Sequence, residues 1–510
     1  MNIEKTGFFV LILIGFGLQG LPQLQHSKSS GTAANDTNSK WVVTDPYYPK
    51  FHVAAPYGWM NDPHPVYFKG AYHLFYQYSF LRNNPYGRVG LKPGERPQRS
   101  WGHAMSTDLV RWKHMPVALT ASLHGAPNDP HIFSGVVVDH NGVGTALYTI
   151  NNKDIWMATS KDKDLATFTK YPKNPVVKGP PAELPTTGLM RDPWVWKEGN
   201  TWYMIVGSGL ADRKGPVIPL YRSGNLVDWE YMHPFYRADS SNFDYLGDAP
   251  FCECPAFFRL GDKYVLVFSD KTTYLVGRYE NHRFIPEKRG RLDYGESPGV
   301  TDGGIYVPLF ALDDKGRRIM WGWADRWQTV ESQIQEYVKA GWSGMQTLPR
   351  VLTLNADGLI DFEPAEELTA LRTGHKEFSA IPLATDSSRV LDGVQGMHME
   401  INTVFKPGTA ITFGFELLNV SEPARIFYNV ATKSICYNQV SVPLALGRNE
   451  NLDLRFFIDG KLIEIYANKK IVLTEKLKPV NTDGYGIRLF AKDGRATAVK
   501  VDTWKMGTIW

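Results

Sequence analysis

Apolar and polar residues alternate along most of this chain with a period of two, in short blocks separated by glycine and proline. Three blocks share one order: an acidic motif ending in proline, then a glycine, then an apolar run led by an aromatic residue. They start at Asn61-Asp62-Pro63, Arg191-Asp192-Pro193 and Glu253-Cys254-Pro255, and the aromatic residue follows nine positions after each proline. Period-two alternation predicts β-strands, and the glycines predict the turns between them.

Two more blocks extend the repeat, one led by Ser134 and one by Tyr306. The five leading positions (62, 134, 192, 253 and 306) are separated by 53 to 72 residues. A period of this size, built from short strands and turn glycines, is typical of a β-propeller with four strands per blade. We therefore predict a five-bladed propeller over residues 45–365. A β-sandwich or an irregular all-β fold with coincidental spacing is the alternative.

The pattern changes after the last block. Residues 366–379 begin with a helical spacing of apolar positions and predict a linker helix. Residues 380–510 alternate strongly again, and Asp459-Gly460 lies between two apolar runs as a hairpin turn signal. This last part predicts a β-sandwich. The expected fold is all-β, a five-bladed β-propeller followed by a C-terminal β-sandwich, as two domains suit a chain of 510 residues.

The N-terminus resembles a secretory signal. Lys5 precedes an apolar run over residues 8–18, which is too short to span a bilayer as a helix. We predict a signal peptide over residues 1–22, a polar spacer over 23–44, and a secreted protein without stable membrane association. An uncleaved N-terminal anchor is the alternative. Two glycosylation sequons, at Asn35 and Asn419, agree with secretion.

Composition narrows the function further. The net charge is only +4 and no long basic run occurs, so nucleic acid is not an expected partner. Three cysteines provide no disulfide framework. The thirteen histidines lack the spacings of known metal motifs, so they do not predict a metal site. The oligomeric state is left open by these observations.

Acidic residues at equivalent places in different blades converge on the axis of a propeller. Retaining glycoside cleavage needs one carboxylate as nucleophile and one protonated carboxylic acid as proton donor. Crowding of carboxylates raises the pKa of at least one, which keeps a proton available. Taken singly, Asp62 or Asp192 is more often a turn residue, because Asp-Pro pairs are common in turns. The recurrence with Glu253, which lies in an apolar stretch and needs a partner, favours a catalytic reading.

The motifs and their order resemble glycoside hydrolase family 32, the invertases, inulinases and levanases, over residues 50–510. The motifs that carry the resemblance are Trp59-Met-Asn-Asp-Pro63, Phe75-Tyr-Gln-Tyr78, Trp101-Gly-His-Ala104, Asp108-Leu-Val-Arg-Trp112, Phe133-Ser-Gly135, Arg191-Asp-Pro193, Glu253-Cys-Pro255, Trp321-Gly-Trp323 and Gly341-Trp-Ser-Gly-Met-Gln-Thr-Leu-Pro-Arg350. The resemblance implies a propeller joined to a sandwich, without metal or organic cofactor. It also implies cleavage of β-fructofuranosyl bonds in sucrose or fructans.

The resemblance assigns roles position by position. Asp62 matches the nucleophile, Glu253 the acid/base, and Asp192 the residue that holds ring hydroxyls and stabilises the transition state. Further matches to positions that contact the fructosyl unit are Asn61, Gln77, Ser134 and Arg191. Because aromatic rings stack on sugars, we also expect pocket walls from Trp59, Trp101 and Trp323. A retaining enzyme should hold the Asp62 and Glu253 carboxyls about 5–5.5 Å apart.

Several positions depart from the family pattern around these acids. His64-Pro65 replaces a usual Asn-Gly, a basic loop over residues 81–100 replaces a Trp-Gly-Asn wall, and Cys252, Val136 and Ala256 replace other residues. These changes affect substrate preference more than reaction type. Two alternatives stay open: a fructosyltransferase on the same scaffold, and a non-catalytic fructan-binding protein.

Overall fold

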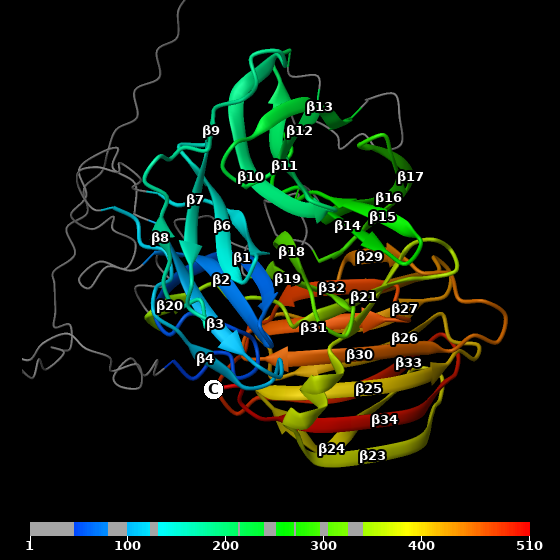
Figure 1. The fold of residues 1–510 in the computed structure, drawn as a ribbon. Coiled ribbons are helices and arrows are strands. Elements are labelled where there is room, and N and C mark those ends of the chain that lie inside the picture. The colour runs from blue at the N-terminus through cyan, green and yellow to red at the C-terminus, as the bar shows by residue number, and fades with distance from the viewer. Residues whose placement is uncertain are drawn as a thin grey trace, which may run out of the picture. The chain divides into compact units, whose positions relative to one another are not determined.

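The computed structural model describes residues 45–79, 99–122, 131–212, 215–238, 251–269, 272–295, 304–324 and 340–510. The predicted signal peptide, the polar spacer, Asn35 and most of the basic loop lie outside the described residues. Residues 40–510 form one compact unit. Figure 1 shows the propeller sheets in blue to green and the sandwich sheets in yellow to red. Within the described part, no helix is long and apolar enough to cross a membrane.

Five antiparallel sheets, here blades 1 to 5 in chain order, build the N-terminal part and confirm the all-β propeller. Blade 1 contains β1 (Gly58–Phe68), β2 (Ala71–Ser79), β3 (Ser100–Ser106), β4 (Trp112–His114) and β20 (Trp342–Ser343). Blade 2 contains β5 (Gly135–His140), β6 (Val143–Ile150), β7 (Asp154–Ser160), β8 (Thr169–Lys170) and β9 (Val177–Lys178). Blade 3 contains β10 (Thr186–Glu198), β11 (Thr201–Leu210), β12 (Pro216–Ser223) and β13 (Glu230–Arg237).

Blades 4 and 5 complete the ring. Blade 4 contains β14 (Ala256–Leu260), β15 (Lys263–Val267), β16 (Thr273–Glu280) and β17 (Arg283–Arg291). Blade 5 contains β18 (Tyr306–Leu312), β19 (Arg318–Trp323), β21 (Arg350–Leu354) and β22 (Ile360–Pro364). After blade 5 begins, the chain returns to blade 1, where β20 pairs in parallel with the start of β1. This pairing joins the last blade to the first one.

Two six-stranded sheets form the C-terminal sandwich. One sheet has the order β23 (Arg372–Leu383), β34 (Ala496–Met506), β25 (His398–Lys406), β30 (Leu452–Asp459), β31 (Leu462–Ala467) and β32 (Ile471–Lys476). The other has the order β24 (Ser387–Gly396), β33 (Tyr485–Lys492), β26 (Thr412–Leu418), β27 (Arg425–Asn429), β28 (Ser434–Tyr437) and β29 (Val440–Pro443). The predicted hairpin forms between β30 and β31, with Gly460 at φ 62°. The second sequon residue, Asn419, is exposed just after β26.

The linker helix predicted over residues 366–379 is wrong in length and type. Only Glu366–Leu371 is helical, as a 3-10 helix (η2), and the chain enters β23 at Arg372. Leu368 and Leu371 are buried, which explains the helical spacing of the apolar positions. The residues that follow pair with β34 over most of their length. Tertiary strand pairing therefore overrides the local helical pattern, and the sandwich begins before residue 380.

One short sequence pattern builds the same corner in blades 1 and 3. Residues 106–112 and 223–229 both read Ser-x-Asp/Asn-Leu-Val-x-Trp, and the leucine has positive φ in each, 62° at Leu109 and 66° at Leu226. In both corners the indole N–H donates to that leucine's carbonyl, at 3.0 Å for Trp112 and 2.9 Å for Trp229. The backbone N–H of Trp112 also donates to Ile509, so the C-terminus covers the blade 1 corner. The blade 3 corner instead lines a surface pocket.

The sandwich packs against the propeller through the sheet that holds β30, β31 and β32. Phe457, Leu462 and Tyr466 belong to the same apolar core as the blades. A fully buried charge cluster lies in this contact. Arg350 of blade 5 makes ion pairs with Asp293 at 2.9 Å and with Glu464 of β31 at 2.8 Å. Burial of both apolar and paired charged groups fixes the sandwich beneath the blades.

Candidate active site

One polar side chain in or just before the first strand of each blade lies toward the centre of the propeller. These residues are Asp62, Ser134, Asp192, Glu253 and Tyr306, the five leading positions of the sequence repeat. Four of these first strands lie side by side, since β1 packs against β5 and β18, and β5 packs against β10. Except for the short pairing of β1 with β20, each of these strands is the edge of its sheet. A free edge tolerates the prolines of the repeat and leaves its polar groups available.

Irregular backbone turns two of the acids out of their strand ladders. The pairing of β1 with β2 shifts register between Met60 and Pro63, and that of β10 with β11 shifts between Arg191 and Trp194. Bulges of this kind re-aim side chains beside active sites. Asp192 also has φ 66°, in the left-handed region that Asp tolerates better than most residues. The acidic motifs therefore need their local irregularity to point inward.

Asp62 is held by two side chains from neighbouring elements. Gln77 Nε2 of β2 donates to Asp62 Oδ2 at 2.8 Å, and Ser134 Oγ donates to the same oxygen at 2.5 Å. Gln77 Nε2 also lies 2.7 Å from Ser134 Oγ, so the three groups form a closed network. Asp62 is 8% exposed. The network therefore fixes the orientation of the Asp62 carboxylate.

Asp192 is buried with only partial compensation of its charge. Its Oδ2 accepts the backbone N–H of Cys254 at 3.1 Å and lies 3.6 Å from Arg191 Nε. Burial raises the pKa of Asp192 to about 6, the Arg191 charge opposes that rise, and the Asp62 charge adds to it. Burial raises the pKa of the Cys254 thiol, and the charges of Asp192 and Asp62 raise it further. These effects place Asp62 and Asp192 in one electrostatic environment.

Glu253 lies at the start of blade 4 and is the most exposed of the three acids, with 26% of its side chain accessible. Its Oε1 accepts from Arg191 Nη2 and its Oε2 accepts from the Tyr306 hydroxyl. The backbone just before Glu253 passes close to Gly207 of β11. Only glycine fits there, because a Cβ at position 207 would collide with the carbonyl of Cys252. Arg191 thus connects Asp192 to Glu253, and all three predicted acids share one site.

The predicted binding residues divide into two groups. Asn61 lies beside Gln77, with 3.5 Å between its Nδ2 and the Gln77 Oε1. Trp59 and Trp323 pack edge to face at 6.0 Å, with Tyr306 against them, at the Glu253 side. Trp101 as a pocket wall is wrong. It has no exposed surface, stacks on His64, and donates its indole N–H to a backbone carbonyl.

Three site residues were not assigned from the sequence. Tyr306 contacts Glu253, Thr149 accepts the backbone N–H of Asp192 at 2.8 Å, and Gln346 Nε2 donates to the Asn61 carbonyl at 2.6 Å. Tyr306 was already a leading position of the repeat, and that equivalence with the acids could have identified it. Thr149 and Gln346 act on backbone atoms, for which the sequence carries no signal.

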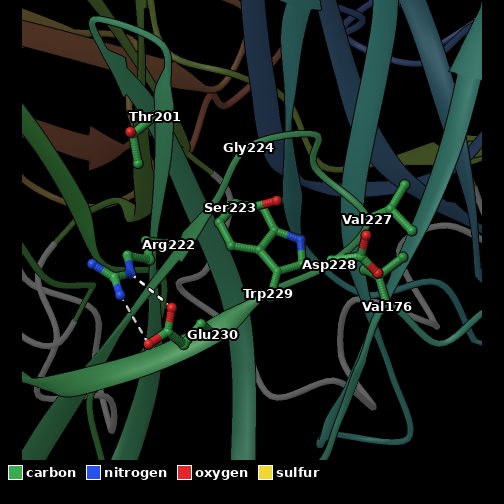
Figure 2. Close-up of a pocket in the computed structure, with 9 residues that line it drawn as sticks. All are labelled: Val176, Thr201, Arg222, Ser223, Gly224, Val227, Asp228, Trp229 and Glu230. Atoms are coloured by element: carbon green, nitrogen blue, oxygen red, sulfur yellow. Dashed lines mark hydrogen bonds and ion pairs between the residues drawn. The ribbon is translucent and has the colours of Figure 1, made fainter.

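The pocket in Figure 2 lies away from this site, on blade 3 and the end of blade 2. It has a volume of about 700 Å³, and its lining residues are Val176, Thr201, Arg222, Ser223, Gly224, Val227, Asp228, Trp229 and Glu230. Its two opposite charges, Arg222 and Glu230, pair with each other through two bonds of 2.8 and 3.0 Å. None of the predicted site residues lines it. The pocket is the open corner around Trp229 described above.

One group of side chains among the described residues has the spacing to hold a metal ion. His375, Glu377 and Asp502 bring one ligand atom each within 4.8 Å, on the sandwich. The Lys500 ammonium lies 3.2 Å from Glu377 and 3.0 Å from Asp502, so a side-chain cation already pairs with both carboxylates. This arrangement does not fit a metal centre.

Comparisons with known proteins match both parts of the chain. Residues 52–363 match the glycosyl hydrolases family 32 N-terminal domain, and residues 367–505 match the family 32 C-terminal domain. A sucrose-6-phosphate hydrolase of Escherichia coli is 30% identical over 494 residues, covering 90% of this chain and 95% of its own length. A levanase of Bacillus subtilis is 29% identical and covers 94% of this chain and 73% of itself.

Solved structures share the fold. Fructan 1-exohydrolase IIa of Cichorium intybus superposes with a TM-score of 0.75 at 23% identity, covering 91% of this chain and 98% of its own. An exo-inulinase of Aspergillus awamori superposes with a TM-score of 0.72 at 21% identity, covering 92% and 100%. With both family domains matched in order and three acids gathered at the propeller centre, the chain belongs to glycosyl hydrolase family 32, as a hydrolase of the β-fructofuranosidase type.

Proposed function

We propose that this protein is a secreted retaining hydrolase that removes terminal β-D-fructofuranosyl units from sucrose and fructans. The observation that carries the proposal is the connection of three acids from three blades. Arg191 contacts both Asp192 and Glu253, and the Asp62 charge acts on Asp192. Such a group can provide a nucleophile, a proton donor and a stabilising charge within one centre.

In the proposed mechanism, Asp62 attacks the anomeric carbon of the fructosyl unit. The network of Gln77 and Ser134 orients the attacking carboxylate and reduces its freedom before the reaction. Glu253 gives a proton to the leaving oxygen as the glycosidic bond breaks. It then takes a proton from water, which attacks the covalent fructosyl intermediate and releases Asp62.

The remaining residues support the charge that develops at the anomeric carbon. Asp192 is positioned to accept sugar hydroxyls in hydrogen bonds that strengthen in the transition state. Tyr306 and Arg191 hold the two oxygens of Glu253 and fix the direction of proton transfer. Trp59 and Trp323 offer apolar surface for a sugar ring. The expected separation of 5–5.5 Å between the Asp62 and Glu253 carboxyls stays a prediction.

The substrate range is proposed from the relatives. Their names include sucrose-6-phosphate hydrolase, raffinose invertase and levanase, so sucrose, its 6-phosphate and fructans are all candidate substrates. The test is separate incubation with sucrose, sucrose 6-phosphate, inulin and levan, followed by chromatography of the products. Free fructose as the first product supports exo hydrolysis. Longer oligosaccharides would indicate endo action, and fructosylated sucrose at high sucrose concentration would favour the fructosyltransferase alternative.

Retention and secretion need their own measurements. NMR of the first fructose released should detect the β-anomer, and an initial α-anomer would contradict a covalent intermediate on Asp62. Secretion predicts a mature protein outside the cell with a new N-terminus close to residue 22. Mass spectrometry of protein from the medium checks this, and also reports whether Asn35 and Asn419 carry glycans.

A further inference from the structure

Arg99 is the residue just before β3, and its side chain extends to the active site. Its backbone is fixed, because its carbonyl accepts the N–H of Ile132 at 2.9 Å and it forms a β-bridge with His131. Its guanidinium carbon lies 5.4 Å from the ring of Trp59 and 5.5 Å from the ring of Phe133. Both distances are within the range of cation–π attraction, so two rings define where the charge sits.

The guanidinium contacts the residue that holds the nucleophile. Arg99 Nη1 donates to Gln77 Oε1 at 3.2 Å, while Gln77 Nε2 donates to Asp62 Oδ2 at 2.8 Å. A guanidinium can only donate, and an ionised carboxylate can only accept. If the Gln77 amide turned over, its oxygen would face the Asp62 carboxylate and its NH₂ would face Arg99. Arg99 and Asp62 therefore impose the same orientation from opposite ends.

Among the described residues, no other side chain donates to Gln77 Oε1 in a way that could replace the Arg99 hydrogen bond equally well. Asn61 Nδ2 lies 3.5 Å from the same Gln77 oxygen, at the outer limit of a hydrogen bond. Gln77 is 2% exposed, so its oxygen lies almost beyond the reach of solvent. A buried acceptor that loses its donor is unfavourable, and the amide becomes free to reorient.

We propose that Arg99 is a positioning residue, which fixes the Gln77 amide and through it the Asp62 carboxylate. The proposal rests on the function proposed above, because it assumes that Asp62 attacks the fructosyl unit. A competing role for the same charge is recognition of a phosphate on the substrate, since several relatives are named sucrose-6-phosphate hydrolases. The two roles predict different kinetics.

The first experiment measures kcat and KM of Arg99→Leu and Arg99→Lys on sucrose and on sucrose 6-phosphate. Positioning predicts a fall in kcat of about 10- to 100-fold for Arg99→Leu, equal on every substrate that the wild type accepts, with little change in KM. Arg99→Lys, which keeps a donor, should recover part of that loss and keeps the experiment valid if the leucine variant folds poorly. Arg111→Leu, at an arginine whose side chain is 83% exposed, is the matched control.

The second experiment is a double-mutant cycle with Gln77→Leu. If Arg99 acts through Gln77, Arg99→Leu should change kcat less than about twofold in the Gln77→Leu background. Multiplying effects in the double variant, a change confined to KM, or a loss confined to sucrose 6-phosphate would each overturn the proposal. The activity of the wild type distinguishes a failure of the proposed function from a failure of the proposed role of Arg99. An inactive wild type overturns both the function and the role of Arg99, whereas an active wild type with unaffected Arg99→Leu overturns only the latter.

Discussion

Two groups of buried acids in this molecule are treated in opposite ways. At the propeller centre, Asp192 and Glu253 share Arg191, and the Asp62 charge disfavours ionisation of Asp192. In the contact between propeller and sandwich, Asp459 and Glu464 are also fully buried. The same residue types are thus crowded at one place and neutralised at the other.

The interface group has a partner for nearly every carboxylate oxygen. Asp459 accepts backbone N–H groups from residues 50, 51 and 52, each at 2.9 Å, and ring nitrogens of His52 and His398 at 2.8 and 2.6 Å. Burial alone would raise the pKa of Glu464, but Arg350 and His52 lower it to about 2. These partners keep the carboxylates ionised. The group therefore joins the propeller to the sandwich and takes no part in a reaction.

Asp192 in the active-site group lacks this compensation. Asp192 has one backbone donor and one arginine at 3.6 Å, and burial raises its pKa to about 6. Uncompensated charge lowers stability, and it is retained where a reaction needs carboxylates that can still accept protons, hydroxyls or a bond to carbon. The comparison teaches that a buried acid is a catalytic candidate when its partners are too few, not merely when it is buried.

The largest expected effect is on the reaction. Asp62→Ala and Glu253→Ala should each lower kcat by about 10⁴-fold or more, because in the proposed mechanism one removes the nucleophile and the other the proton donor. The melting temperature should change little, since each substitution also removes one negative charge from a centre where three acids are crowded. Initial rates on sucrose and inulin, with thermal melts, check this. Turnover close to wild type in either variant would remove that residue from the mechanism.

The opposite result is expected at the interface. Glu464→Leu removes one of the two buried carboxylates that pair with Arg350 and one of the two that pair with His52, and should lower the free energy of unfolding by about 3–5 kcal/mol. Urea unfolding at pH 7 measures the loss. Glu363→Gln is the matched control, because Glu363 is half-exposed and pairs with the exposed Lys469. An equal loss in both variants would mean that the buried pairing has no special weight.

The sequence predicted the propeller and the five leading positions of its blades, because both follow from a periodic pattern, while the catalytic roles of the three acids stay predictions. It could not predict the interface group. Asp459 was interpreted as a hairpin turn residue, and its partner His52 lies 407 positions earlier in the chain. Trp101 failed for a similar reason, since an aromatic residue in a motif carries no signal for the face it occupies. Long-range contacts decide both cases.

A third prediction uses pH to test His52. Burial would lower its pKa, but hydrogen bonds to Asp459 and Glu464 raise it to about 9. A histidine whose pKa is higher in the folded state stabilises the protein fully below about 6.5, and that contribution disappears as pH rises through 9. The wild type should lose up to about 3 kcal/mol of stability between pH 6.5 and 9.

His52→Gln should remove most of this pH dependence, while His282→Gln on the outer hairpin of blade 4 should preserve it. Urea unfolding at pH 6.5, 7.5 and 9 compares the three proteins. A wild type whose stability is unchanged over this range would show that His52 is neutral in its buried site.

The contribution of Asp192 to stability should depend on the protonation state in the opposite sense, because its folded state favours the neutral carboxyl. Its pKa is about 6 in the folded protein and about 4 when unfolded, so the folded state binds more protons between these values. Stability should therefore fall by up to about 3 kcal/mol as pH rises from 4 to 6, and Asp192→Asn should flatten the curve. The same variant should lose activity by about 10²-fold. A wild type that gains stability from pH 4 to 6, with no difference in Asp192→Asn, would contradict the assignment.

The smallest effect is expected where a charge pair is exposed. Arg222 and Glu230 beside the pocket in Figure 2 form a two-bond pair, but their side chains are 50% and 64% exposed. Water screens such a pair, and ordering two long side chains opposes it. Arg222→Ala should therefore leave both kcat and the melting temperature indistinguishable from wild type. A measurable loss of activity would connect this pocket to the active site. A measurable loss of stability would mean that good hydrogen-bond geometry stabilises an ion pair in this fold even without burial.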